Sequence, residues 1–136
     1  MTRIMAIDYG QKRVGVAITD PLCTIPQPLL TIKPKSVADL IKRLKCIVDE
    51  NNVGLIIVGN PVSMRGEPTE ISRQIERFIK RLKRQLDIDV EKWDERYLSK
   101  YAVNKFKEAG LSMKKGDIDR VAASLMLEEY LLTRRS

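Results

Sequence analysis

The chain has 136 residues, and its 25 Lys and Arg residues outnumber its 18 Asp and Glu residues, which gives a formal net charge of +7. This length fits one domain, residues 1–136, and excludes a two-domain enzyme, while an apolar fraction of 43% excludes gross disorder. The excess of positive charge is typical of proteins that bind a polyanion such as nucleic acid, although many other soluble proteins share it.

Membrane and secreted classes do not fit this sequence. The longest apolar runs, such as residues 55–58, are far shorter than the roughly 18 residues of a membrane span, and Asp8 interrupts the apolar N-terminal stretch. The chain contains no histidine, and Cys23 and Cys46 stand far apart, which excludes ordinary zinc sites and histidine-dependent mechanisms. Because two isolated thiols suit a reducing compartment, we expect a cytoplasmic protein that contacts no membrane.

An antiparallel hairpin is predicted at the start of the chain. Residues 3–8 form a short apolar strand, a tight turn follows over 9–12, and the β-branched and small residues of 14–19 form a second strand. The turn is too short for a parallel crossover. A third strand is expected within 24–33, where two prolines restrict it to a sheet edge or a loop.

The first helix is predicted to begin at Ser36, with Asp39 completing a capping box, and to end at residues 51–52. Residues 53–58 are almost continuously apolar, as in strands buried on both faces of a sheet. The Gly-Asn-Pro sequence of residues 59–61 is expected to break this strand.

The second half alternates helices and strands. An amphipathic helix is predicted over 71–86, a strand over 88–93, a third helix over 98–110 and a final helix over 117–132. The order βββαβαβαα predicts an α/β fold, with a mixed sheet covered by helices on both faces. The 71–86 helix has a basic face, which is either solvated or a track for RNA; its members are Arg73, Arg77, Lys80, Arg81 and Arg84.

Three carboxylates stand where predicted elements begin or end. Asp8 ends the first strand, Glu95 follows the strand over 88–93, and Asp119 lies at the start of the last helix. Sites in open α/β sheets gather at the carboxyl ends of strands, so these side chains can meet at one edge. Asp94 is the alternative to Glu95, because either neighbour at a strand end can turn inward.

Helical spacing decides which acid of the last helix faces the sheet. Asp119 shares one stripe with Ala122 and Ala123, whose small side chains allow the helix to lie close to the sheet. Asp117 is two positions away from Asp119 and is therefore expected to face outward.

Carboxylates without histidine or cysteine partners favour a hard divalent cation, Mg²⁺ or Mn²⁺. Two such ions about 4 Å apart can stabilise the attacking and leaving oxygens of a phosphodiester. Each acid taken alone is more often a solvated charge or a helix cap, so the hypothesis depends on the three together.

Residues 7–17, Ile-Asp-Tyr-Gly-Gln-Lys-Arg-Val-Gly-Val-Ala, resemble the opening of the YqgF (RuvX) family of Holliday-junction-resolvase-like proteins. Further matches follow in order over essentially the whole chain: Asp20-Pro21-Leu22, Gln27-Pro28-Leu29, Ile57-Val58-Gly59 with Pro61, Gly66, Asp94-Glu95-Arg96, and Asp119 with Ala122-Ala123. The resemblance implies a ribonuclease H-like fold and a metal-dependent nuclease in which Asp8, Glu95 and Asp119 form an acidic triad that binds Mg²⁺ or Mn²⁺.

The cellular role that this resemblance implies is maturation of the 5′ end of the 16S ribosomal RNA precursor, and an older analogy is cleavage of branched DNA at Holliday junctions. Junction cleavage would require a homodimer, whereas precursor processing is compatible with a monomer. Two further alternatives are a factor that binds precursor rRNA without cleaving it and, less favoured at this length, an actin-like ATPase.

Phosphate contacts are expected from Lys12 and Arg13 in the first turn, from Arg65 in the loop of residues 59–68, and from Arg96 beside the triad. Lys12 and Arg13 are alternatively ordinary hairpin charges. The sequence departs from the family at Asn60, where an apolar residue is usual.

Overall fold

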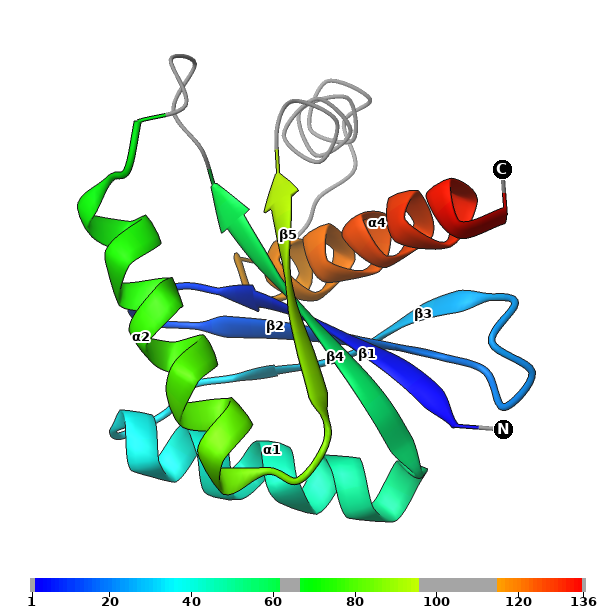
Figure 1. The fold of residues 1–136 in the computed structure, drawn as a ribbon, viewed down its shortest axis with the longest axis horizontal. Coiled ribbons are helices and arrows are strands. Elements are labelled where there is room, and N and C mark those ends of the chain that lie inside the picture. Colours follow the sequence, from blue (N-terminus) through cyan, green and yellow to red (C-terminus); the bar gives the residue numbers. More distant parts are fainter. Residues whose placement is uncertain (1, 62–66, 96–114, 136) are drawn as a thin grey trace.

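A five-stranded mixed sheet forms the centre of the molecule, and helices cover both of its faces (Figure 1). This computed structural model describes residues 2–61, 67–95 and 115–135. The strands are β1 (Arg3–Tyr9), β2 (Val14–Thr19), β3 (Pro26–Ile32), β4 (Val53–Pro61) and β5 (Asp89–Glu95), and their order in the sheet is β3-β2-β1-β4-β5. The predicted mixed sheet is therefore confirmed, while the predicted helix over 98–110 lies outside the described residues.

The predicted hairpin is present, with β1 antiparallel to β2 and Asp8 directly opposite Gly15. β1 also pairs in parallel with β4, and β4 with β5, so the carboxyl ends of these three strands share one edge of the sheet. β3 lies at the opposite edge, where a proline that lacks an N–H group is tolerated, as the sequence predicted.

The three described helices are α1 (Val37–Asn51), α2 (Glu70–Gln85) and α4 (Lys115–Arg135). The Ser36 hydroxyl caps α1 by accepting a bond from the Asp39 amide at 3.0 Å, but the Asp39 carboxylate accepts from the Lys35 amide and not from that of Ser36, so the predicted capping box is incomplete. Asn52 ends α1 in the left-handed conformation, with φ of 55°. None of the described helices is both long and apolar enough to cross a membrane.

Two strands are longer than the sequence predicted. The expected break at residues 59–61 is wrong, because β5 continues the pairing: Gly59 lies opposite Trp93, and Pro61 opposite Glu95. As a result, positions 94 and 95 lie within β5 and not beyond it. The alternation of the strand therefore assigns them to opposite faces of the sheet.

The two faces of the sheet are packed differently. The α1–α2 face holds the larger apolar core, which includes Met5, Ile7, Val16, Ile56 and Val58 from the strands. The α4 face holds a smaller core. Its buried sheet residues are Ala6, Ala17 and Ile57, which pack with Ala123, Met126, Leu127, Tyr130 and Leu131 of α4, and the partly buried Ile4, Leu55 and Trp93 pack against this cluster. The small side chains of Ala6 and Ala17 let α4 lie close to the sheet.

The backbone of α4 lies directly against Gly15 of β2. A Cβ atom added there would overlap the carbonyl group of Asp119 and would lie 2.8 Å from the backbone nitrogen of Arg120. Glycine inside a strand often marks such a close backbone approach. The absence of a side chain at position 15 is what allows the first turns of α4 to rest on the hairpin.

Replacement of Gly15 by alanine is predicted to lower the free energy of unfolding by about 1–3 kcal/mol, because the new methyl group meets backbone that cannot move without displacing α4. Urea unfolding of wild type and Gly15→Ala measures this difference. An unchanged unfolding midpoint would contradict the packing described for α4.

Candidate active site at the carboxyl edge of the sheet

Asp8 lies on the α4 face of β1, near the strand's carboxyl end. Met5 and Ile7 belong to the core beneath α1 and α2, whereas Ala6 packs against α4, so the alternation of the strand puts Asp8 on the α4 side. Burial, and next the negative charge of Asp119, raise the pKa of Asp8 from 3.8 to about 6. Asp8 and Asp119 are thus electrostatic neighbours, as the sequence predicted.

Asp119 is held beside the hairpin by Arg13. The Arg13 Nε atom donates to the Asp119 Oδ2 atom at 2.9 Å, and the two side chains are 30% and 22% exposed. The interactions of Asp119 with Arg13 and Asp8 confirm that Asp119 faces the sheet, and Asp117 pairs with Arg120 on the same helix. The pairing of Arg13 with an acid was not predicted, because 106 positions separate the partners in sequence.

Asp94 belongs to the opposite face from Asp8. Its Oδ1 atom accepts a hydrogen bond from the Nδ2 atom of Asn60 at 3.3 Å, and its neighbour Lys92 pairs with Glu76 of α2. Trp93 packs instead against Tyr130 of α4, with ring centroids 5.4 Å apart. Alternation along β5 then assigns position 95 to the α4 face, like Asp8.

The predicted site residues are only partly within the described structure. Asp8 and Asp119 come together, while the side chain of Glu95 and the whole of Arg65 and Arg96 lie outside the described residues. Lys12 is exposed in the hairpin turn. Among the side chains that are described, no group of three potential metal ligands is present.

One residue of the site was missed at the sequence level. Gly15, opposite Asp8, determines how close Asp119 can come, and its signal was available as a glycine inside a predicted strand. Arg13 was predicted as a phosphate ligand, and in the structure its guanidinium contacts an acid of the site.

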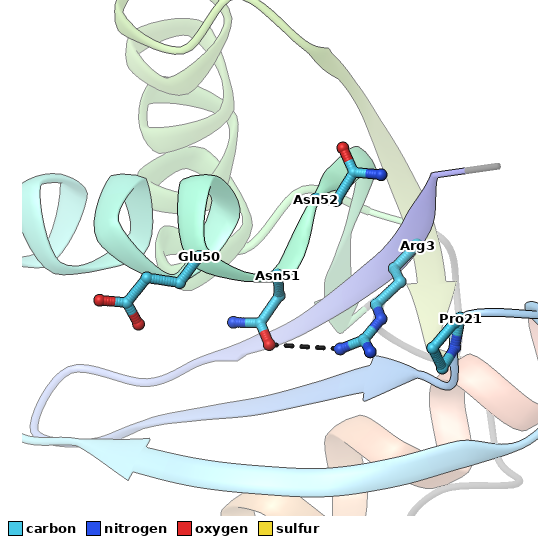
Figure 2. A pocket seen from close by; sticks show the side chains of 5 residues that line it. All are labelled: Arg3, Pro21, Glu50, Asn51 and Asn52. Atoms are coloured by element: carbon cyan, nitrogen blue, oxygen red, sulfur yellow. Dashed lines mark hydrogen bonds between the residues drawn. The ribbon is translucent and has the colours of Figure 1, made fainter.

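A hollow of about 270 Å³ lies at the other end of β1, lined by Arg3, Pro21, Glu50, Asn51 and Asn52 (Figure 2). Within it the Arg3 Nη1 atom donates to the Asn51 Oδ1 atom at 3.2 Å. Arg3 and Asp8 are five residues apart on one strand, a separation of about 17 Å. This hollow is therefore separate from the acidic site.

The raised pKa of Asp8 predicts that the metal-free protein loses stability as the pH rises. Between pH 3.8 and about 6 the folded state binds more protons than the unfolded state, so the free energy of unfolding falls with pH and stays lower above that range. Asp8→Asn removes the charge, and the variant is predicted to be about 1–3 kcal/mol more stable than wild type at pH 7 and equally stable below pH 4. Denaturant unfolding at several pH values, with chelator present, tests this.

Asp20 provides a control, because its pKa is shifted in the direction opposite to that of Asp8. Backbone N–H groups, that of Ile25 first, lower its pKa to about 2, so Asp20→Asn is predicted to destabilise the protein at pH 7. If Asp8→Asn were also less stable than wild type at pH 7, Asp8 would not carry a desolvated charge next to Asp119.

The sequence matches the RuvX family, described as Holliday junction resolvase, over residues 2–133. A relative from Chlorobium phaeobacteroides (strain BS1) is 42% identical over 134 residues, covering 95% of this chain and 91% of its own. One from Bacteroides fragilis (strain YCH46) is 39% identical over 140 residues, covering 99% of both chains. Both bear the name "Putative pre-16S rRNA nuclease".

Solved structures with the same fold are more distant in sequence. The RuvC protein of T. thermophilus in complex with a Holliday junction substrate has a TM-score of 0.63 at 13% identity, covering 100% of this chain and 97% of its own. The fowlpox virus Holliday junction resolvase has a TM-score of 0.55 at 15% identity, covering 99% and 100%. These similarities establish the ribonuclease H-like fold that the sequence predicted.

Proposed function

This chain belongs to the RuvX family, and we propose that it is a metal-dependent endonuclease that processes the 5′ end of the 16S rRNA precursor in the cytoplasm. The names of its relatives and its net charge of +7 support this substrate. The observation that carries the proposal is the meeting of Asp8 and Asp119, which come from the first strand and the last helix.

The donor set fits Mg²⁺ or Mn²⁺. Asp8 and Asp119 supply hard oxygen ligands, and the pKa of Asp8, raised by burial and by Asp119, indicates two carboxylates that a cation would stabilise. We assign Glu95 as the third ligand, because position 95 shares the α4 face with Asp8, whereas Asp94 is bonded to Asn60 on the other face. Two ions bound by these acids would supply an activated water and would stabilise the leaving oxygen of the phosphodiester.

The chain's own residues position the substrate and the acids. Arg13 fixes the carboxylate of Asp119 against the hairpin and offsets part of the negative charge of the site. Lys12, exposed in the same turn, is available to bind a phosphate of the RNA backbone. We assign Arg65 and Arg96 the same role from their positions next to β4 and β5 in the sequence.

Exchange of single acids on β5 tests the assignment of the third ligand. Glu95→Gln is predicted to lower the cleavage rate at least about 100-fold, because loss of a metal ligand removes several kcal/mol of transition-state stabilisation. Asp94→Asn is the matched control and is predicted to change the rate by less than about tenfold, because Asp94 is bonded to Asn60 on the face opposite Asp8. Cleavage of a precursor rRNA fragment with Mn²⁺, measured under single-turnover conditions, distinguishes them. Equal rates for the two variants, or a larger loss for Asp94→Asn, would contradict the assignment.

Removal of Asp8 tests the proposed metal site without relying on catalysis. Mn²⁺ is predicted to raise the thermal midpoint of wild type, because a ligand that binds only the folded state stabilises it, and to leave that of Asp8→Asn nearly unchanged. The same variant is predicted to cleave precursor RNA at least about 100-fold more slowly than wild type. A folded Asp8→Asn protein that cuts as fast as wild type would refute the acidic triad.

Branched DNA is a second candidate substrate, favoured by the description of the matching family as a Holliday junction resolvase. Wild-type protein with Mn²⁺ should be given a precursor rRNA fragment, a single strand and a four-way DNA junction side by side. Preferential cleavage of the rRNA fragment by a monomer supports precursor processing. Paired cuts in the junction by a homodimer would support resolution instead.

A further inference from the structure

Among the helices that the structure describes, α2 has the largest excess of positive charge. α2 carries six basic and two acidic residues, whereas α1 carries three of each and α4 four of each. α2 therefore has a net charge of +4, whereas α1 and α4 are each neutral. A solvated helix needs no such imbalance, so the distribution indicates a polyanionic partner at α2.

Ion pairs divide α2 into a neutralised half and a basic half. Glu70 lies 3.6 Å from Arg73 and 3.7 Å from Arg77, and Glu76 lies 2.9 Å from Lys92 of β5. The four remaining basic residues of the helix form no ion pair with an acid in the described part of the chain. They are Lys80, Arg81, Lys83 and Arg84.

A hollow of about 200 Å³ between α2 and β5 is lined by Lys80, Lys83 and Lys92, with Ile79 and Glu76 completing its wall. It is smaller than the pockets that enclose drug-sized ligands. Its size suits a single phosphate of a strand that passes over it. We call it the α2–β5 basic groove.

The groove lies beside β5, which is an edge strand of the sheet. Lys92 lies on the α2 face of β5, and Trp93, the next residue, packs against Tyr130 of α4 on the other face. Because α2 runs along β4 and β5 (Figure 1), a strand that contacts both the acidic site and α2 would pass around this edge.

We propose that the α2–β5 basic groove binds the sugar–phosphate backbone of the RNA substrate at a distance from the cleaved bond. This inference rests on the proposed function for its choice of RNA. A membrane fits the groove poorly, because the exposed large apolar residues of the described chain lie on other elements and none is in α2. Binding through phosphates alone would be independent of base sequence.

The proposal is tested by removing two positive charges from the groove. As a control, two positive charges are removed from α1, which has equal numbers of acidic and basic residues. Lys80→Gln/Lys83→Gln removes two charges from the groove, and Lys42→Gln/Lys45→Gln removes two exposed charges from α1. Affinity for a precursor rRNA fragment is measured by fluorescence anisotropy with chelator present, over a series of salt concentrations. The groove variant is predicted to bind more weakly. The plot of its log K against log salt is predicted to be less steep than that of wild type, with the magnitude of the slope smaller by about 1.4–1.8. The α1 variant is predicted to keep the wild-type slope.

The outcomes separate this inference from the proposed function. Equal slopes for the two double variants, with both proteins folded as shown by circular dichroism, would overturn the groove as a binding surface, while Mn²⁺-dependent cleavage by wild type would leave the nuclease intact. Wild-type protein that neither binds nor cuts the fragment would overturn both. A loss of slope that is confined to the groove variant supports the inference even if cleavage is never detected.

Discussion

The site depends on the contact between the backbone of α4 and Gly15. Gly15 lies opposite Asp8 in the hairpin, and the carbonyl of Asp119 rests where a side chain at position 15 would be. This contact brings an acid of the last helix beside an acid of the first strand and within reach of Arg13. A larger residue there would lift the helix and separate the two carboxylates, so the packing of the fold and the assembly of the site have one physical origin.

Side chains alternate along β5, so successive residues of this strand belong to different faces of the sheet and to different proposed sites. Lys92 and Asp94 belong to the α2 face, where they contact Glu76 and Asn60 respectively. Trp93 packs under α4 on the other face, to which position 95 also belongs. The proposed metal site and the proposed groove therefore lie on opposite faces of the sheet, and the two proposals together require an RNA strand that passes around the β5 edge.

The mixed sheet and the meeting of Asp8 with Asp119 could be predicted from the sequence. The features that were missed depend on contacts between distant parts of the chain. Strand-end acids and the alanine stripe of the last helix predicted that Asp8 and Asp119 would meet, because both signals are local. The extension of β4 through Asn60 was missed, because its stabilising partner is β5, more than 30 residues away. The same error left Asp94 and Glu95 unresolved, since the pleat assigns faces only once a strand's end is known. The pairing of Arg13 with Asp119 is a long-range contact with no local signal.

Anomalous diffraction from crystals grown with Mn²⁺ would locate the ions relative to the three acids. We predict anomalous peaks within about 2.0–2.3 Å of carboxylate oxygens of Asp8, Glu95 and Asp119, with the Arg13 guanidinium still beside the hairpin. Peaks confined to other acids, or the side chain of Asp94 turned to the α4 face to bind the ion in place of Glu95, would contradict this prediction.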